Sequence, residues 1–206
     1  MADPLDVLTN VSRETQDTLQ AFAAFTLKWN ARINLISRRD EASIHQRHIA
    51  DSAQLFEHVP QTANTWTDLG SGGGFPGLVC AILARDRRPD LTITLIESDT
   101  RKCVFLREAA RTFDLSVTVE NTRIEAATDH KADIISARAL APLSRLLTLA
   151  HRFCHPGTVL LFPKGKTARS ELTAARETWH ISIEALPSRT DPEGTILKLS
   201  EVAPRS

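Results

Sequence analysis

The sequence predicts an α/β protein with a seven-stranded, mostly parallel, doubly wound sheet and an N-terminal helical extension. From residue 66 onward, short apolar runs alternate with helical patterns. Strands separated by crossover helices pair in parallel. The last two strands have only Pro187–Glu193 between them, which is room for a hairpin and not for a helix crossover. The sheet should therefore end in an antiparallel pair.

The N-terminal part should form two helices. Residues 5–33 repeat apolar side chains at multiples of three and four residues, and Asn34 can end this helix. Asp40 can cap a second helix, whose apolar side carries Ile44, His48, Leu55 and Val59. Two helices of this length cannot bury a hydrophobic core of their own. Residues 1–60 should therefore pack as an extension on the main unit, 61–206, with Gln61–Thr65 as the linker.

The remaining elements follow from length and periodicity. Strands are expected at 66–69, 91–97, 116–120, 132–137, 157–163, 180–186 and 194–200. Helices are expected at 76–85, 99–113, 142–152 and 168–178. At 206 residues, and without internal repeats, the chain should fold as one compact unit.

The composition indicates where in the cell the protein works and which kinds of site it lacks. No segment approaches the roughly 18 apolar residues of a membrane span, and the first residues lack the basic start and apolar core of a secretion signal. Cys80, Cys103 and Cys154 show no C-x-x-C spacing, which argues against a disulfide framework or a metal site. We expect a cytoplasmic protein that uses neither a membrane nor a metal.

The most informative segment is Trp66–Gly77, which reads W-T-D-L-G-S-G-G-G-F-P-G. A short strand carrying Asp68 breaks into a turn with glycines at 70, 72, 73 and 74. Glycine tolerates positive φ and lets a backbone approach a ligand that side chains would block. The helix that follows points its free N–H groups at the same place. This is the first strand, loop and helix of a nucleotide-type binding site.

The glycine spacing favours a ligand without phosphate. The dinucleotide pattern G-x-G-x-x-G fails at Phe75, whereas Gly70, Gly72 and Gly74 satisfy G-x-G-x-G. A carboxylate at Asp68 would sit poorly beside a pyrophosphate, but well beside the ammonium and sulfonium groups of S-adenosylmethionine. Glu97 ends the next strand, where it can accept ribose hydroxyls. The alternative is a tight turn that binds nothing.

Basic residues are unevenly distributed, although the net charge is zero. Residues 136–170 contain no carboxylate, yet they include Arg138, Arg145, Arg152, Lys164, Lys166 and Arg169. A second cluster comprises Arg38, Arg39, His45, Arg47 and His48. Two basic loops beside the ligand would form a phosphate track for RNA. The alternative is a solvated face with chance clustering.

Further motifs carry a family resemblance. They are K-W-N-A-R-I-N-L at 28–35, R-H-I-A-D-S at 47–52, D-L-G-S-G-G-G-F-P-G at 68–77, R-I-E at 123–125, R-A-L-A-P-L at 138–143 and P-K-G at 163–165. Over residues 29–198 the chain resembles the bacterial 16S rRNA guanine-N7 methyltransferases, also called glucose-inhibited division protein B. Departures are small: Glu97-Ser98 stands where aspartate-serine is common, and Ala50 and Ala53 replace leucines.

The resemblance implies a Rossmann-like class I methyltransferase fold, with S-adenosylmethionine as cofactor. It also implies a substrate, N7 of a guanine in the 530 loop of 16S rRNA (guanine 527), within the small ribosomal subunit or its precursor, and a monomeric enzyme. The expected cofactor contacts are Asp68, Gly70, Gly72, Gly74, Phe75, Glu97, Ser98, Ile124, Glu125 and Arg138. The residues expected to position the substrate are Arg47, His48, Asp51, Arg138 and Lys164.

The chemistry of guanine N7 agrees with what the sequence lacks. N7 carries a lone pair and no proton, so its methylation needs alignment and no general base. Amine methylation normally uses a (D/N)-P-P-(Y/F/W) motif after the fourth strand, where this chain reads S-A-R-A and has no tyrosine. Cytosine C5 methylation needs a cysteine nucleophile in a loop, but two of the cysteines fall inside predicted helices and the third follows one.

Several of these residues can also have purely structural roles, without contact to a ligand. Glu125 can be an acid of a first helical turn, Arg138 a surface arginine, and Lys164 the end of a strand. Arg47, His48 and Asp51 can serve in capping or helix pairing. For the whole chain, the alternatives are a small-molecule methyltransferase, a non-catalytic nucleotide- or RNA-binding module, and an NAD-dependent dehydrogenase. Asp68 and Phe75 disfavour the dehydrogenase.

Overall fold

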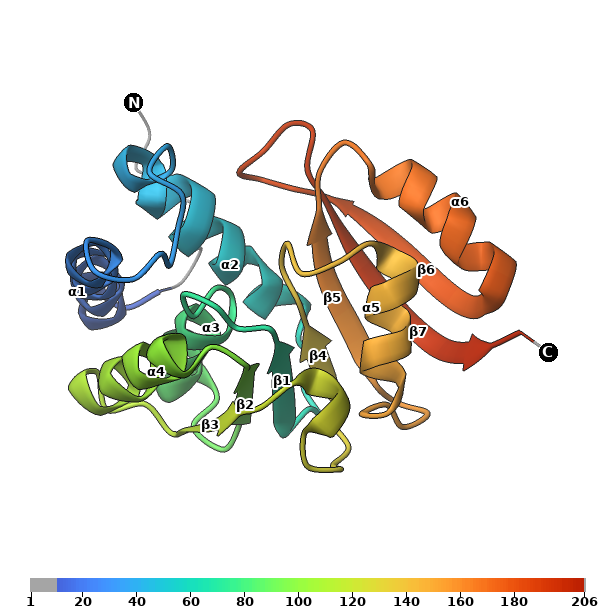
Figure 1. Ribbon diagram of the computed structural model, residues 1–206, viewed down its shortest axis with the longest axis horizontal. Coiled ribbons are helices and arrows are strands. Elements are labelled where there is room, and N and C mark those ends of the chain that lie inside the picture. The colour runs from blue at the N-terminus through green and yellow to red at the C-terminus, as the bar shows by residue number, and fades with distance from the viewer. Residues whose placement is uncertain (1–10, 206) are drawn as a thin grey trace.

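The computed structural model describes residues 11–205, and it contains the predicted seven-stranded sheet (Figure 1). The strand order is β3-β2-β1-β4-β5-β7-β6. β1 to β5 run parallel, and β7 runs antiparallel to both β5 and β6. The strands are β1 (Thr65–Leu69), β2 (Thr92–Glu97), β3 (Val117–Asn121), β4 (Ile134–Ser136), β5 (Val159–Lys164), β6 (Trp179–Pro187) and β7 (Thr195–Pro204). The predicted fold class is confirmed.

Helices cover the sheet in two groups, as Figure 1 shows. The first group, beside β1 to β3, is α1 (Arg13–Asn30), α3 (Gly77–Arg87) and α4 (Thr100–Thr112). The second group, beside β5 to β7, is α5 (Leu143–His151) and α6 (Ala168–Thr178). The chain thus leaves β1 toward one face and β4 toward the other. A crevice opens at the carboxyl ends of strands where the order reverses in this way.

The N-terminal residues share a core with the sheet domain. Leu19 and Phe22 of α1 are fully buried in the same apolar cluster as Leu78 of α3 and Phe105 of α4. The rings of Phe22 and Phe75 lie 5.6 Å apart, so α1 packs directly behind the glycine loop. The described N-terminal residues therefore pack against the helices of the sheet domain. No helix within residues 11–205 is long and apolar enough to cross a lipid bilayer.

The first helix is shorter than predicted. Ser12 caps α1 by accepting a hydrogen bond from the Thr15 amide, and the predicted residues 5–10 lie outside the described part of the chain. The helix ends at Asn30 instead of Asn34. The Asn30 side-chain oxygen accepts hydrogen bonds from the amides of Leu35 and Ile36, at 2.8 and 3.0 Å. These bonds fold residues 31–36 into a turn, because they offer the backbone an alternative to helix.

The second helix is not the regular helix that the sequence predicts. It is a succession of a 3-10 turn (Glu41–Ser43), a π-helical turn (His45–Ala50), the short α2 (Asp51–Ala53) and a second 3-10 turn (Gln54–His58). Asp40 makes no side-chain capping bond, because its carboxylate accepts from Ser37 and pairs with Arg47. Irregular turns of this kind are frequent at functional sites.

The other boundaries lie within a few residues of those predicted. Thr65 belongs to β1 and not to the linker, β4 is only three residues long, and β7 extends to Pro204. The bounds of α6 match the prediction.

Candidate active site

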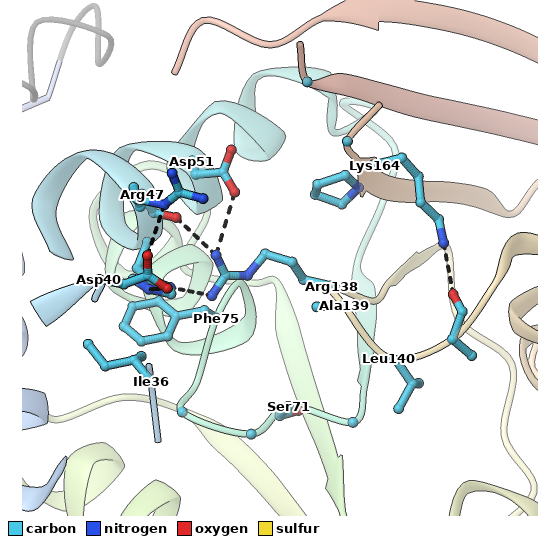
Figure 2. A pocket seen from close by; sticks show the side chains of 18 of the residues that line it. Ile36, Asp40, Arg47, Asp51, Ser71, Phe75, Arg138, Ala139, Leu140 and Lys164 are labelled. Atoms are coloured by element: carbon cyan, nitrogen blue, oxygen red, sulfur yellow. Dashed lines mark hydrogen bonds and ion pairs between the residues drawn. The ribbon is translucent and has the colours of Figure 1, made fainter. Parts of the chain in front are cut away.

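A cavity of about 1320 Å³ opens at the carboxyl ends of the parallel strands (Figure 2). Its walls are the glycine loop after β1, the ends of β2 and β3, the loop after β4, the end of β5, residues 35–51 and the loop between β6 and β7. Pockets for one small molecule measure about 300–1,000 Å³. This cavity has room for a nucleoside ligand and part of a second reactant.

The glycine loop presents bare backbone to the cavity. Gly70, Gly72 and Gly74 adopt φ of +66°, +55° and +81°, which side-chain-bearing residues rarely adopt. A Cβ built on Gly72 would meet only the Gly70 carbonyl oxygen, at 3.7 Å, so that atom would occupy open cavity space. Gly74 has a different reason to be glycine, because a Cβ there would lie 2.5 Å from Leu78 of α3. Gly72 is therefore the position where a ligand can approach the chain.

Asp68 supports this loop from beneath. Its side chain is fully buried and is not among the residues that line the cavity. Ser136 Oγ donates to Oδ1 at 2.6 Å, and the Gly77 amide donates to Oδ2 at 3.3 Å. Burial raises the pKa of Asp68 to about 6, although these hydrogen bonds oppose the rise. Asp68 thus faces the fold, and not the charged group of a ligand as the sequence suggested.

Glu97 closes the β2 side of the cavity. One carboxylate oxygen accepts from the Gly72 amide at 2.9 Å, and the other accepts from the Asp99 amide at 2.7 Å. Each carboxylate oxygen has two lone pairs, so both can accept a further hydrogen bond. Ser98, Ile124 and Glu125, three of the residues predicted to contact a cofactor, also line the cavity. The half-exposed Glu125 also pairs with Arg145.

Arg138, in the loop after β4, joins the glycine loop to the N-terminal segment. Its Nη1 donates to the Arg47 carbonyl at 3.0 Å and lies 3.6 Å from Asp51 Oδ2. Its Nη2 lies 2.5 Å from His48 Nδ1, and its Cζ lies 5.4 Å from the centre of the Phe75 ring. Figure 2 shows this side chain pointing at Asp40, Arg47 and Asp51. The structure therefore brings together four of the five residues predicted to position a substrate.

His48 is held as a neutral acceptor in this cluster. The guanidinium of Arg138 can only donate, so His48 Nδ1 accepts and Nε2 carries the proton. Nε2 faces Asp40 Oδ2 at 3.6 Å, beyond hydrogen-bond distance. Burial, followed by the charge of Arg138, lowers the pKa of His48 to about 4. Burial also lowers the pKa of Arg138, while Asp51 and Asp68 oppose that shift.

Lys164 is the fifth residue predicted to position a substrate. Its side chain holds a neighbouring loop, and an acid balances its charge. Its side chain lines the cavity but is only 10% exposed. Nζ donates to the Ala141 carbonyl at 2.8 Å and lies 2.9 Å from Glu171 Oε2. An ammonium with these partners stabilises the loop between β4 and α5 and is not free to bind phosphate.

The structure does not form the basic track that was predicted over residues 136–170, because most of its cations are paired. Acids from other parts of the chain pair with five of its six cations. The pairs are Arg138–Asp51, Arg145–Glu125, Arg152–Asp129, Lys164–Glu171 and Lys166–Glu193. A segment without carboxylates in the sequence is therefore largely neutralised in the fold.

Exposed positive charge lies elsewhere around the cavity. Arg38 and Arg39 are exposed, have no ion pair within residues 11–205, and are flanked by Ser37 and Asp40 of the cavity wall. Sequence reasoning missed Arg123, which is exposed, lines the cavity and is likewise without an ion pair in the described part. Arg123 is the first residue of the R-I-E motif at 123–125, so this motif could have indicated it as a site residue.

Sequence reasoning also missed the loop between β6 and β7. Buried Gln54 accepts from the Arg189 amide at 3.0 Å and donates to Ser188 Oγ and Thr190 Oγ1, both at 3.2 Å. Thr190 Oγ1 also donates to Asp51 Oδ1 at 2.8 Å. These bonds fix the loop as the outer wall of the cavity. No local pattern in the sequence points to a contact across more than 130 residues.

A glycine loop after β1, an acid at the end of β2 and a terminal antiparallel pair define the class I, Rossmann-like methyltransferase fold. A solved class I S-adenosylmethionine-dependent methyltransferase from Listeria monocytogenes superposes with a TM-score of 0.63 at 14% identity. The match covers 93% of this chain and 71% of that one.

The particular family follows from the sequence comparisons. The model of the family rRNA small subunit methyltransferase G matches residues 15–190, and the chain belongs to this family. Ribosomal RNA small subunit methyltransferase G of Rhodospirillum centenum is 53% identical, over 95% of this chain and 88% of the relative. The protein of the same name from Gluconobacter oxydans is also 53% identical, over 94% of this chain and 97% of the relative.

Proposed function

We propose that this protein transfers a methyl group from S-adenosylmethionine to N7 of a guanine in the 530 loop of 16S rRNA, guanine 527 by family resemblance. The observation that carries the proposal is one continuous cavity with two unlike ends. One end has the bare Gly72 backbone and Glu97, and the other has the Arg138 cluster. Family membership supports an rRNA substrate.

The residues at the first end fit S-adenosylmethionine. Gly72 leaves space that any Cβ would fill, and Glu97 offers lone pairs suited to ribose hydroxyls. Gly70, Phe75, Ser98, Ile124 and Glu125 complete this wall. Asp68 and Gly74 act indirectly, by holding the loop. When bound, the cofactor supplies a methyl group on a positively charged sulfur.

The second end fits a nucleophile that carries no proton. His48 accepts from Arg138, and Asp40 and Asp51 both pair with arginines. These groups are engaged in holding one another and are poor general bases. Guanine N7 has an in-plane lone pair, so the reaction needs only in-line alignment, with about 3–3.5 Å between the reacting atoms. Arg138 and its partners are proposed to give that alignment.

The exposed arginines are the proposed phosphate contacts. Arg38 and Arg39, next to the cavity wall, and Arg123, on the wall, have no ion pair in the described residues, and their charge is available to the RNA backbone. Such contacts supply affinity that falls steeply with salt. We propose a monomer that acts in the cytoplasm on 16S rRNA in the small subunit or its precursor.

The decisive experiment is transfer of labelled methyl from S-adenosylmethionine to naked 16S rRNA, small subunits and tRNA. Chain cleavage at 7-methylguanine then maps the modified base. The proposal expects label at one guanine of the 530 loop, and less label from Gly72→Ala protein when S-adenosylmethionine is below saturation. Label on tRNA or small molecules alone, or on a base elsewhere in 16S rRNA, would contradict it.

A further inference from the structure

Leu140 is an exposed apolar side chain on the wall of the cavity. Within residues 11–205, two large apolar side chains are exposed: Val104 at 50% and Leu140 at 37%. Val104 lies on α4 and does not line the cavity, whereas Leu140 does. Leu140 therefore presents apolar surface to the inside of the cavity.

Leu140 lies on the cavity wall beside the glycine loop. It covers Gly70, because a Cβ built on that glycine would lie 2.7 Å from Leu140 Cδ1. In Figure 2 it points away from Arg138, on the side of the loop nearer Lys164. The wall also carries the uncharged residues Ala139, Ala141, Pro142 and Pro163. Together they form an apolar strip beside the cofactor end.

The fold fastens the chain on both sides of Leu140. On one side, Arg138 contacts Arg47, His48 and Asp51.

On the other side, Lys164 binds the Ala141 carbonyl, and the Leu143 amide donates to Glu171 at 2.8 Å. Between these anchors, Ala139 adopts φ +52°, a left-handed conformation that residues other than glycine rarely adopt. Such a conformation persists only where the surroundings determine it, and here it fixes the direction of Leu140.

On the basis of the function proposed above, we propose that Leu140 is the platform for the target guanine, packing against one face of the purine. A base removed from its stack needs an apolar surface for its face. The chain has no tyrosine, and Phe75, the aromatic ring of the cavity wall, is only 5% exposed beneath Arg138. Leu140 is the exposed apolar side chain beside the cofactor end.

The test compares Leu140→Ala, Leu140→Met and the control Val104→Ala with the wild-type chain. Three quantities are measured: the Kd for S-adenosylhomocysteine, kcat/KM for RNA methylation, and the fluorescence change of a 530-loop hairpin carrying 2-aminopurine at the target position. Leu140→Ala should lower kcat/KM about tenfold, because apolar contact area is lost. It should also reduce the fluorescence change and leave the Kd within about twofold. Leu140→Met keeps the apolar area and should stay close to wild type, as should Val104→Ala.

Three outcomes would overturn the inference. If Leu140→Ala matches Val104→Ala in every measurement, the side chain has no role in binding the base. If the cofactor Kd weakens as much as kcat/KM falls, Leu140 belongs to the donor site. If wild-type protein methylates no RNA, the proposed function fails, and the platform fails with it. If the wild-type protein methylates the RNA and Leu140→Ala changes none of the three quantities, the role of Leu140 is refuted and the proposed function is not. Thermal unfolding of each variant shows whether it is folded.

Discussion

Replacing Ser136 with alanine should destabilise the fold and loosen the glycine loop. Ser136 is fully buried at the end of β4, directly opposite Asp68 of β1 in the sheet register. Its hydroxyl donates to Asp68 Oδ1 at 2.6 Å and accepts from Trp66 Nε1 at 2.8 Å. Alanine removes both bonds and leaves a buried N–H and a buried carboxylate each short of one partner.

The size of the effect follows from those two bonds. A hydrogen bond to a charged group contributes about 1.5–3 kcal/mol, and an unsatisfied buried donor costs about 1–3 kcal/mol. We expect Ser136→Ala to lower the free energy of unfolding by about 3–5 kcal/mol near neutral pH. This is a large part of the roughly 5–15 kcal/mol typical of a native protein.

The effect should depend on pH in a definite direction. The pKa of Asp68, about 6, lies above its ordinary value of 3.8, so ionisation of Asp68 costs stability as the pH rises between these values. The Ser136 hydrogen bond lowers this pKa, and its loss must raise the pKa further. The extra cost therefore develops as the pH rises above about 6. Ser136→Ala should be more damaging at about pH 8 than at about pH 5, whereas the Trp66 contribution is the same at both.

Urea unfolding at the two pH values measures this, with Ser182→Ala as the control. Ser182 Oγ also donates to a carboxylate, Glu201, at 2.6 Å, but on the exposed surface. Exposed polar contacts of this kind are worth about 0–1 kcal/mol. Equal small losses for the two variants, or a Ser136→Ala loss that does not change with pH, would refute the role assigned to the buried pair.

Three further predictions concern the cavity. Gly72→Ala should weaken S-adenosylhomocysteine binding at least about tenfold by calorimetry, whereas Gly157→Ala, which lies outside the residues that line the cavity, should not; equal affinities would contradict the cradle. Arg38→Glu should weaken RNA binding in gel shifts and lower the slope of log affinity against log salt by about 0.7–0.9, while Arg176→Glu on α6 leaves both unchanged. Because burial lowers the pKa of His48 to about 4, its ring should show no NMR titration between about pH 5 and 8; a midpoint near 6.5 would mean that the ring is accessible to water.

The sequence by itself determined the order of elements. Strand and helix periodicities are local, and so is the length of a connection, so seven strands with a terminal hairpin could be predicted from spacing. The role of the glycines at 70, 72 and 74 could also be predicted, because positive φ is a property of single residues. Several residues of the walls at the ends of β1, β2 and β3 were therefore among those predicted, although Arg123 was missed.

Tertiary structure alone decided which charges are available. Asp68 looked like a ligand contact because its spacing from Gly70 is visible, but its partner Ser136 lies 68 positions away. Lys164 looked free because residues 136–170 contain no acid, but the fold of α6 brings Glu171, just beyond that segment, to it. Ion pairs and burial depend on distances in space, which packing sets and sequence spacing does not record. For the same reason, the clamped position of Leu140 emerged only from the fold.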